Sequence, residues 1–331
     1  MRRSITSILR TVAAGLLAAL TSICGAPLGA TAQEYPSKPI HWIIPVPPES
    51  PVDIIGRRIA DAVAAKLKAV IVVDNRPGAS GTIGANEAAK AVPDGYTLLF
   101  SVADPFTNAI SLLKSPPYDP RTAFKYISKI VDDAPMLIAT SSVKANTLKE
   151  LIADAKTSEI SYGSFGPGSF PQIIMEALSK ETGAKFHLVQ YRGVPAAMHA
   201  LLNNEVPLSF ANVAQVRSQI SEGKLKPMAA IGRRSAVLPN VPTFAEAGFD
   251  DPIFRNTIWM GLAGPTGLPP ATVDKTYAAL KEVLAEPALQ SFIANTGFAV
   301  VGNSPVDFER EVIAQYRAVD QLIKERGITG E

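Results

Sequence analysis

The stretch "IHWIIPVPPESPVDIIGRRIADAVAAKL", residues 40–67, decides the fold class. It begins with a short apolar run, "IHWIIPV" (40–46), and passes through a proline-rich turn into the amphipathic segment "VDIIGRRIADAVAAKL" (52–67). Short apolar runs are typical of buried strands, and amphipathic segments of this length are typical of helices. The stretch therefore predicts a strand followed by a helix.

The same alternation continues along the chain and predicts an α/β protein with mostly parallel sheets. Strands are expected at 69–75, 96–102, 134–141, 160–165, 186–191, 206–212 and 225–232. Helices are expected at 81–92, 147–157, 171–183, 195–204, about 272–284 and 305–326. Two blocks of this pattern predict two lobes, 33–131 with 254–331 and 132–253, joined at loop-rich stretches near 114–135 and 247–260.

The N-terminus has the three parts of a secretory signal peptide, residues 1–32. Basic residues begin it, an apolar run follows at 12–23, and "ATA" (30–32) fits a cleavage site before Gln33. That run is shorter than the roughly 20 residues needed to span a bilayer. We therefore expect a protein exported to the periplasm with its leader removed.

The expected exported chain is nearly neutral and has no cysteine. The leader holds three of the 32 basic residues and none of the 30 acidic ones, which leaves 29 basic against 30 acidic residues. Nucleic-acid binding needs a concentrated basic surface, so this balance argues against that partner. Because Cys24 lies in the leader, disulfides and thiolate metal sites are excluded from the exported chain.

Two strand-to-helix loops predict helix N-termini that face a ligand. In "YGSFGPGSF" (162–170), Ser169 and Gln172 have the spacing of a capping box, with Pro171 in the first turn. In "PVPPESPVD" (45–53), Ser50 is expected to cap the helix and Asp53 to be its capping acid. Free N–H groups at such ends favour anions, and an ordinary capped loop is the alternative.

Other motifs give weaker indications. The segment "VVDNRPGASGTIG" (72–84) lacks both nucleotide-loop patterns, so a structural turn is preferred there. Arg192 ends a predicted strand and is a candidate ligand contact, whereas Trp42 and Trp259 are expected to pack in the interior. The three histidines stand singly and no G-x-S-x-G or H-E-x-x-H motif is present, so an enzyme is not predicted.

Several long motifs together resemble the receptors of tripartite tricarboxylate transporters, also called the Bug family. They cover residues 35–331 in family order: "YPSKPIHWIIPVPP", "VVDNRPGASGTIGANEAAKAVPDGYTLL", "YGSFGPGS", "VQYRGVPAAMHALLNNEV", "LPNVPTFAEAG" and "WMGLAGPTGLPP". The resemblance implies a type II periplasmic binding protein fold, with two α/β lobes that close on a small organic acid. It implies a monomeric receptor without cofactor or metal that serves a membrane permease; a sensor role and an exported hydrolase are the alternatives.

The resemblance also implies which residues hold the ligand carboxylate. The family loops map onto Pro47, Pro48, Glu49, Ser50, Asp53, Ser164, Gly166, Gly168 and Ser169. Three positions depart from the family: Glu49-Ser50 replaces a double glycine, Gln172 a frequent histidine, and Asn212, a further site candidate, a common aspartate. We expect Glu49 to redirect specificity toward a ligand with an added hydroxyl, amide or amine.

Overall fold

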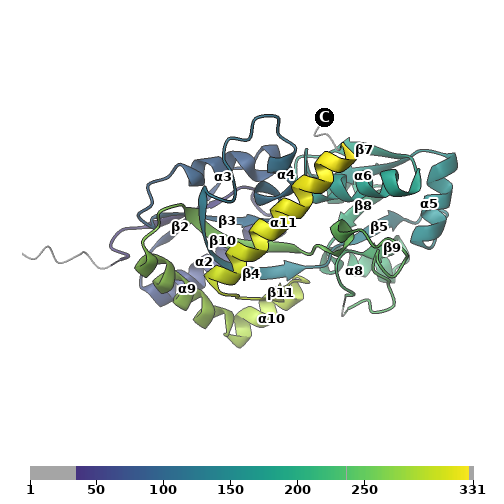
Figure 1. Cartoon of the computed structure of the whole chain (residues 1–331). Helices are drawn as coiled ribbons and strands as arrows, with labels where there is room; N and C mark the ends of the chain where they lie inside the picture. Colours follow the sequence, from purple (N-terminus) through teal and green to yellow (C-terminus); the bar gives the residue numbers. More distant parts are fainter. Residues whose placement is uncertain (1–34, 236, 328–331) are drawn as a thin grey trace, which may run out of the picture. The chain divides into compact units, whose positions relative to one another are not determined.

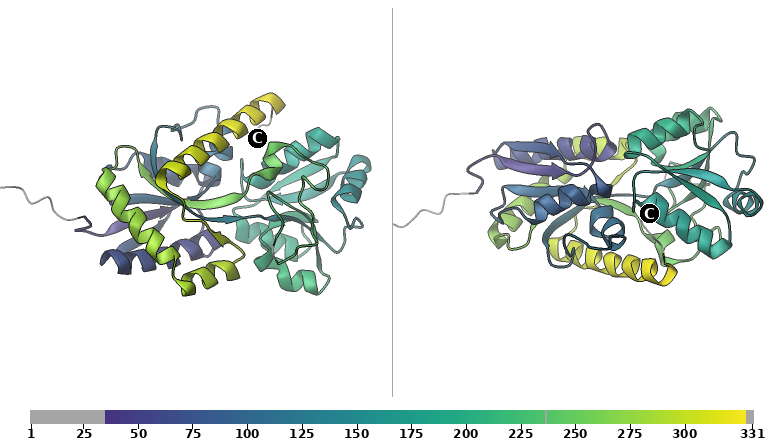
Figure 2. Two further views of the ribbon diagram at one scale, coloured as in Figure 1. Left: turned by 60° about the horizontal axis from the view of Figure 1, so that its bottom comes forward. Right: turned by 90° about the horizontal axis from the view of Figure 1, so that it is seen from above.

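A computed structural model describes residues 35–235 and 237–327, and residues from Lys38 onward form one compact unit. The predicted signal peptide lies outside the described residues. Two sheets organise the unit (Figures 1 and 2). The first, in the order β11-β4-β10-β3-β1-β2, contains β1 Ile40–Ile44, β2 Ile71–Asn75, β3 Thr97–Val102, β4 Phe124–Asp133, β10 Ile258–Pro265 and β11 Ala299–Val300. The second, in the order β7-β6-β8-β5-β9, contains β5 Met136–Thr140, β6 Ile160–Ser164, β7 Phe186–Gln190, β8 Leu208–Ala211 and β9 Leu225–Ala230.

Helices surround both sheets, which confirms the α/β class. Those beside the first sheet are α2 Pro51–Leu67, α3 Thr82–Ala89, α4 Asn108–Ser111, α9 Pro270–Leu284 and α10 Pro287–Asn295. Those beside the second are α5 Leu148–Thr157, α6 Phe170–Thr182, α7 Val194–Leu202 and α8 Val213–Ser221. The helix α11, Pro305–Arg326, has the bounds that the sequence predicts.

The prediction of mostly parallel sheets is wrong, because both sheets are mixed. In the first sheet β1 is parallel to β2 and β3, but β10 is antiparallel to β3 and β4. In the second sheet β6 is parallel to β7 and β8, but β5 is antiparallel to β8 and β9. Strand β5 follows β4, and β10 follows β9, so each of the two enters from the other sheet and runs against its new neighbours.

The stretch 114–135, expected to be a loop-rich joint, contains the ten-residue strand β4. Lys125 and Lys129 interrupt its apolar pattern, and both are paired with the first turns of α11. Lys125 Nζ lies 3.1 Å from Glu309 Oε2, and Lys129 pairs with Glu311. These two lysines therefore connect the strand to helix α11.

Helix α11 runs alongside both sheets (Figure 1) and contributes to both apolar cores. Phe308 and Val312, near its start, pack in the core of the first sheet, while Val319 and Ile323 pack in the core of the second. Trp259, 3% exposed as predicted for an interior residue, donates from Nε1 to Gln315 Oε1 at 2.7 Å. The helix is thus a third connection between the sheets, besides the two places where the chain crosses between them.

We expect Gly261→Ala to lower the free energy of unfolding by about 1–3 kcal/mol, the usual cost of overpacking a core. A Cβ there would lie 2.3 Å from Phe308 Cζ and 2.9 Å from the Ser128 carbonyl oxygen, which backbone pairing holds in place. The matched control is Gly163→Ala in β6, where the nearest atoms would be 3.3 Å away. Urea unfolding measures both variants, and equal stabilities would contradict the prediction.

Candidate functional site

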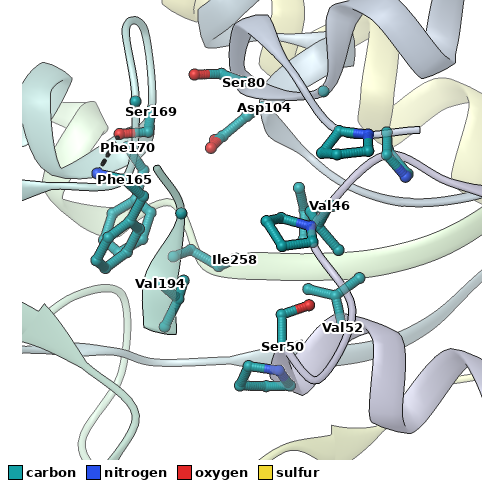
Figure 3. A pocket seen from close by; sticks show the side chains of 18 of the residues that line it. Val46, Ser50, Val52, Ser80, Asp104, Phe165, Ser169, Phe170, Val194 and Ile258 are labelled. Atoms are coloured by element: carbon teal, nitrogen blue, oxygen red, sulfur yellow. Dashed lines mark hydrogen bonds between the residues drawn. The ribbon is translucent and has the colours of Figure 1, made fainter. Parts of the chain in front are cut away.

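A cavity of about 500 Å³ lies among the loops at the strand ends of both sheets (Figure 3). In α/β proteins, ligands commonly bind where the carboxyl ends of strands meet. The first sheet contributes Pro45–Pro47, Ser50–Val52, Pro77–Gly81, Val102, Asp104 and Asp133. The second contributes Phe165–Pro167, Ser169, Phe170, Tyr191–Val194, Phe210–Asn212 and Gln215, and the lining is completed by Pro135, Ile258, Met260 and Phe298.

The loop after β1 has the cap that the sequence predicts. Ser50 Oγ accepts from the Asp53 N–H at 3.3 Å, and Pro51 begins α2. Because this contact uses Ser50 Oγ as an acceptor, the hydroxyl keeps its hydrogen as a donor, and Ser50 lines the cavity. Pro48 and Glu49 lie on the exposed side of the loop, outside the lining.

Asp53 supports this loop from behind the cavity. Its carboxylate accepts from Glu49 N at 3.0 Å, Arg57 Nε at 3.0 Å and Asn75 Nδ2 at 2.8 Å. Burial alone would raise the pKa of Asp53, but these three hydrogen bonds and the charge of Arg57 hold it below the ordinary value. Asp53 therefore fixes the position of Ser50 and does not line the cavity.

The predicted capping box of Ser169 and Gln172 is wrong. Ser169 is the N-cap residue of α6, but its Oγ lies 2.8 Å from Ser164 Oγ and accepts from Phe165 N at 3.3 Å. Gln172 Oε1 accepts from Gly168 N at 2.9 Å. Both side chains bond to residues of the preceding loop, so they fix that loop and leave the first turn of the helix uncapped by Ser169.

Of the serine-glycine residues, Gly166 and Ser169 line the cavity, while Ser164 and Gly168 lie behind it. Ser164 is fully buried and anchors Ser169. The Gly168 N–H, which the sequence analysis offered to a ligand carboxylate, is already used by Gln172. The predicted carboxylate-binding loop is therefore only partly available to a ligand.

Asp104 is a cavity residue that sequence reasoning missed. It follows β3, and its carboxyl group accepts from the backbone N–H of Phe170, the first residue of α6, and from Asn108 Nδ2 at 3.2 Å. Its hydrogen bond with Phe170 places it beside Ser169, at the start of α6 (Figure 3). Burial among protein atoms raises the pKa of Asp104 to about 7, although these two hydrogen bonds oppose the rise.

Asp133 and Asn212 form a second polar group in the lining. Asp133 ends β4 and is 6% exposed. Burial raises the pKa of Asp133 to about 7, although the Ala134 N–H, the Asn212 side chain and the charge of Arg233 oppose this rise. Asn212 caps α8 by accepting from Ala214 N at 2.8 Å, and its buried Nδ2 has no hydrogen bond of standard geometry within 35–235 and 237–327. The predicted residue Asn212 thus lies in the cavity, beside an acid that was not predicted.

Arg192 lines the cavity as an exposed cation. It follows β7, as the sequence predicts, and it has no hydrogen bond or ion pair with another residue of the described part of the chain. The adjoining residues Tyr191, Gly193 and Val194 also line the cavity. Its guanidinium group is therefore free to bind a carboxylate.

The segment 77–81, expected to be a structural turn, also lines the cavity and touches the second sheet's loops. Ser80 Oγ donates to the Pro167 carbonyl, and a Cβ at Gly166 would lie 3.1 Å from Ser80 Oγ. Ala79 and Ser80 have the positive φ values 46° and 49°, unusual for residues other than glycine. The turn interpretation was therefore incomplete, because this strained turn forms part of the cavity rim.

Within the described ranges, no helix is both long and apolar enough to cross a membrane. The same residues contain no cluster of three or more His, Cys, Asp or Glu side chains placed to hold a metal ion. What surrounds the charged groups of the cavity is mainly apolar: Val46, Val52, Val102, Phe165, Phe170, Phe210, Ile258, Met260 and Phe298. Such a lining suits a ligand with a short carbon skeleton and polar ends.

Comparison with known proteins agrees with this geometry. A family model described as the tripartite tricarboxylate transporter family receptor matches residues 55–328. Protein BugT of Bordetella pertussis is 32% identical over 280 residues, which cover 83% of this chain and 84% of BugT.

Two solved structures extend the similarity to the fold. The periplasmic binding protein BugD has a TM-score of 0.81 and 32% identity, covering 89% of this chain and 99% of that one. An R. palustris protein solved with adipate has a TM-score of 0.81 and 25% identity, with the same two coverages. These likenesses confirm the type II binding-protein fold with its two lobes.

Proposed function

We propose, because this chain belongs to the family of tripartite tricarboxylate transporter receptors, that it captures a small organic carboxylate and delivers it to the membrane permease of such a transporter. The relatives of this fold include periplasmic binding proteins, which indicates a receptor rather than an enzyme. Export to the periplasm through cleavage after residue 32, and action as a monomer, belong to the same proposal.

The observation that carries the proposal is an arginine, without a partner among the described residues, in a mainly apolar cavity between strand ends of two sheets. Arg192 offers a planar group that matches a carboxylate, and the Ser50 and Ser169 hydroxyls lie in the same lining. The R. palustris relative solved with adipate shows that a protein of this fold holds a carboxylate. Among the predicted site residues, we therefore assign ligand contact to Pro47, Ser50, Gly166, Ser169, Arg192 and Asn212.

The remaining predicted residues receive supporting roles. Asp53 and Ser164 hold Ser50 and Ser169, and Gly168 is tied to Gln172. Glu49, exposed and outside the lining, affects a ligand only through the loop or through its long-range charge. A Glu49→Gly variant with an unchanged ligand profile and unchanged affinities would end the hypothesis that this residue redirects specificity.

We also propose how the cavity opens. The chain passes between the sheets at 134–135 and 231–257, close to the predicted lobe boundaries, 33–131 with 254–331 and 132–253. Rotation about these crossings separates loops that now touch, such as Pro47 and Gly193, where a Cβ on the glycine would lie 3.3 Å from the proline ring. A ligand drives closure through its better fit to the closed state.

We expect a thermal-shift screen of the purified protein to identify carboxylates as ligands. A ligand at about 1,000 times its dissociation constant stabilises the native state by roughly 4 kcal/mol. Arg192→Ala should weaken binding by about tenfold or more, because hydrogen bonds to charged groups contribute roughly 1.5–3 kcal/mol. Arg217→Ala, an exposed arginine on α8 outside the lining, is the control. Binding confined to neutral or cationic compounds would contradict the proposed ligand class.

A further inference from the structure

The position expected to bind a ligand carboxylate is already filled by the protein. The first-turn N–H of Phe170 is bonded to Asp104, and the Gly168 N–H is bonded to Gln172. A ligand carboxylate at the start of α6 would therefore lie against the carboxyl group of Asp104. Arg192, a lining cation with no partner in 35–235 and 237–327, follows a different strand and is the better partner for that carboxylate.

Two acidic side chains then face the rest of the cavity. Neither Asp104 nor Asp133 forms an ion pair with a lysine, arginine or histidine of the described ranges. The basic group whose charge acts on Asp133 is Arg233, and this arginine is paired with Asp132 at 3.1 Å. A buried carboxylate without a cationic partner is costly, so each acid is either protonated or ready to accept a positive group.

The neighbours of these acids favour acceptance of a positive group over protonation. Asp133 already accepts from the Ala134 N–H, and Asn212 lies beside it; Asp104 accepts from Asn108 and Phe170. Hydrogen bonds of this kind stabilise the ionised form of a carboxyl group. A ligand cation would complete the neutralisation of groups that the protein has already oriented as acceptors.

We propose, resting on the receptor function above, that Asp104 and Asp133 form a subsite for an ammonium group. The ligand class is then a small amino carboxylate whose carboxylate binds Arg192 and whose nitrogen binds one or both acids. Between them, the apolar side chains contact the carbon skeleton. Of the added groups expected from Glu49, a hydroxyl, an amide or an amine, the amine is recognised by these two cavity acids.

Proton release is a signature of this subsite. Both acids have a pKa raised to about 7 in the empty cavity, so a bound ammonium must displace protons from them below that pH. The groups facing them are Asn108 and the Phe170 N–H for Asp104, and Asn212, the Ala134 N–H, Arg233 and Asp132 for Asp133. Affinity for an amino carboxylate should therefore rise between pH 6 and pH 8.

The test uses pairs of acids that differ by one amino group: succinate and aspartate, glutarate and glutamate, adipate and 2-aminoadipate, pentanoate and 5-aminopentanoate. Isothermal titration measures their affinities for the purified protein at pH 6.0, 7.0 and 8.0. We expect the amino compound to bind at least about tenfold tighter in one or more pairs, as a charged hydrogen bond allows. Titration in two buffers of different ionisation enthalpy should show proton release.

Three variants locate the effect. Asp104→Asn and Asp133→Asn should reduce the preference for the amino compound to about threefold or less while retaining binding of the unsubstituted acids. Asp61→Asn, an exposed acid on α2 outside the lining, should keep the wild-type preference. If the unsubstituted acids bind as well as or better than their amino analogues, the ammonium subsite is overturned and the carboxylate receptor stands. If no acid of either kind binds, both proposals fail.

Discussion

The ligand-free protein is expected to unfold at a higher temperature at pH 5.5 than at pH 8.0. Asp104 and Asp133 each have a pKa of about 7 in the folded state, against 3.8 for an ordinary aspartate. Between these values the folded state binds more protons than the unfolded state, so stability falls as pH rises. The contribution is complete below about pH 4 and is lost as pH passes through 7.

This trend is opposite to the usual behaviour of paired acids. Asp53, Asp119 and Glu246 have lowered pKa values, so their contribution to stability is lost only as pH falls toward and below their ordinary range. The window from pH 5.5 to 8.0 therefore lies above the range in which these paired acids titrate, and it includes the raised pKa values of the two cavity acids. Each raised pKa corresponds to a few kcal/mol at most, at about 1.4 kcal/mol per pH unit of difference.

Thermal unfolding of ligand-free protein across this window measures the effect. The double variant Asp104→Asn with Asp133→Asn should lose most of the slope, because its amides do not titrate, and Asp61→Asn should keep it. A wild-type melting temperature that is constant or rises from pH 5.5 to 8.0 would show that the acids are ionised in the folded empty cavity. An excess of an amino carboxylate should reduce the slope, since its ammonium stabilises the ionised acids.

The elements that the sequence predicts correctly are those with local causes. Ser50 and Pro51 begin α2 because the cap and the first-turn proline act within four residues, and α11 has both its predicted ends for similar reasons. Strand β4 was missed, and the lysines that interrupt its apolar pattern, Lys125 and Lys129, pair with glutamates of α11 nearly two hundred residues away. Its assignment depends on a contact that no local pattern contains.

In the site, too, the sequence does not predict which partners the polar groups have. The sequence places Arg192 and Ser169 at strand ends, and both line the cavity. It predicts a capping box between Ser169 and Gln172. In the structure Ser169 contacts Ser164 instead, and the first N–H of α6 donates to Asp104, which follows a strand of the other sheet. An acid two residues after a predicted strand, as Asp104 is, was the available signal, although its partner at the start of α6 was not.

Opening of the cavity leads to the prediction with the largest kinetic effect. A disulfide between Ser80→Cys and Gly166→Cys should slow ligand association by about a hundredfold or more, because a closed receptor cannot admit its ligand. These residues come from different lobes, and a Cβ at Gly166 would lie 3.1 Å from Ser80 Oγ. That is close to the roughly 3 Å between the Cβ of one cysteine and the sulfur of the other in a disulfide.

Any disulfide that forms can be assigned to these two positions, because the expected exported chain, from Gln33, has no other cysteine. Stopped-flow mixing with a carboxylate identified by thermal shift should show slow association for the oxidised double variant and recovery after reduction. The two single variants separate closure from local damage, since Gly166 has a φ of 131° and any side chain there is strained. If the oxidised protein binds as fast as the reduced protein, ligand enters without separation of 77–81 from 165–167, and the opening must lie on the side of Arg192 and Pro47.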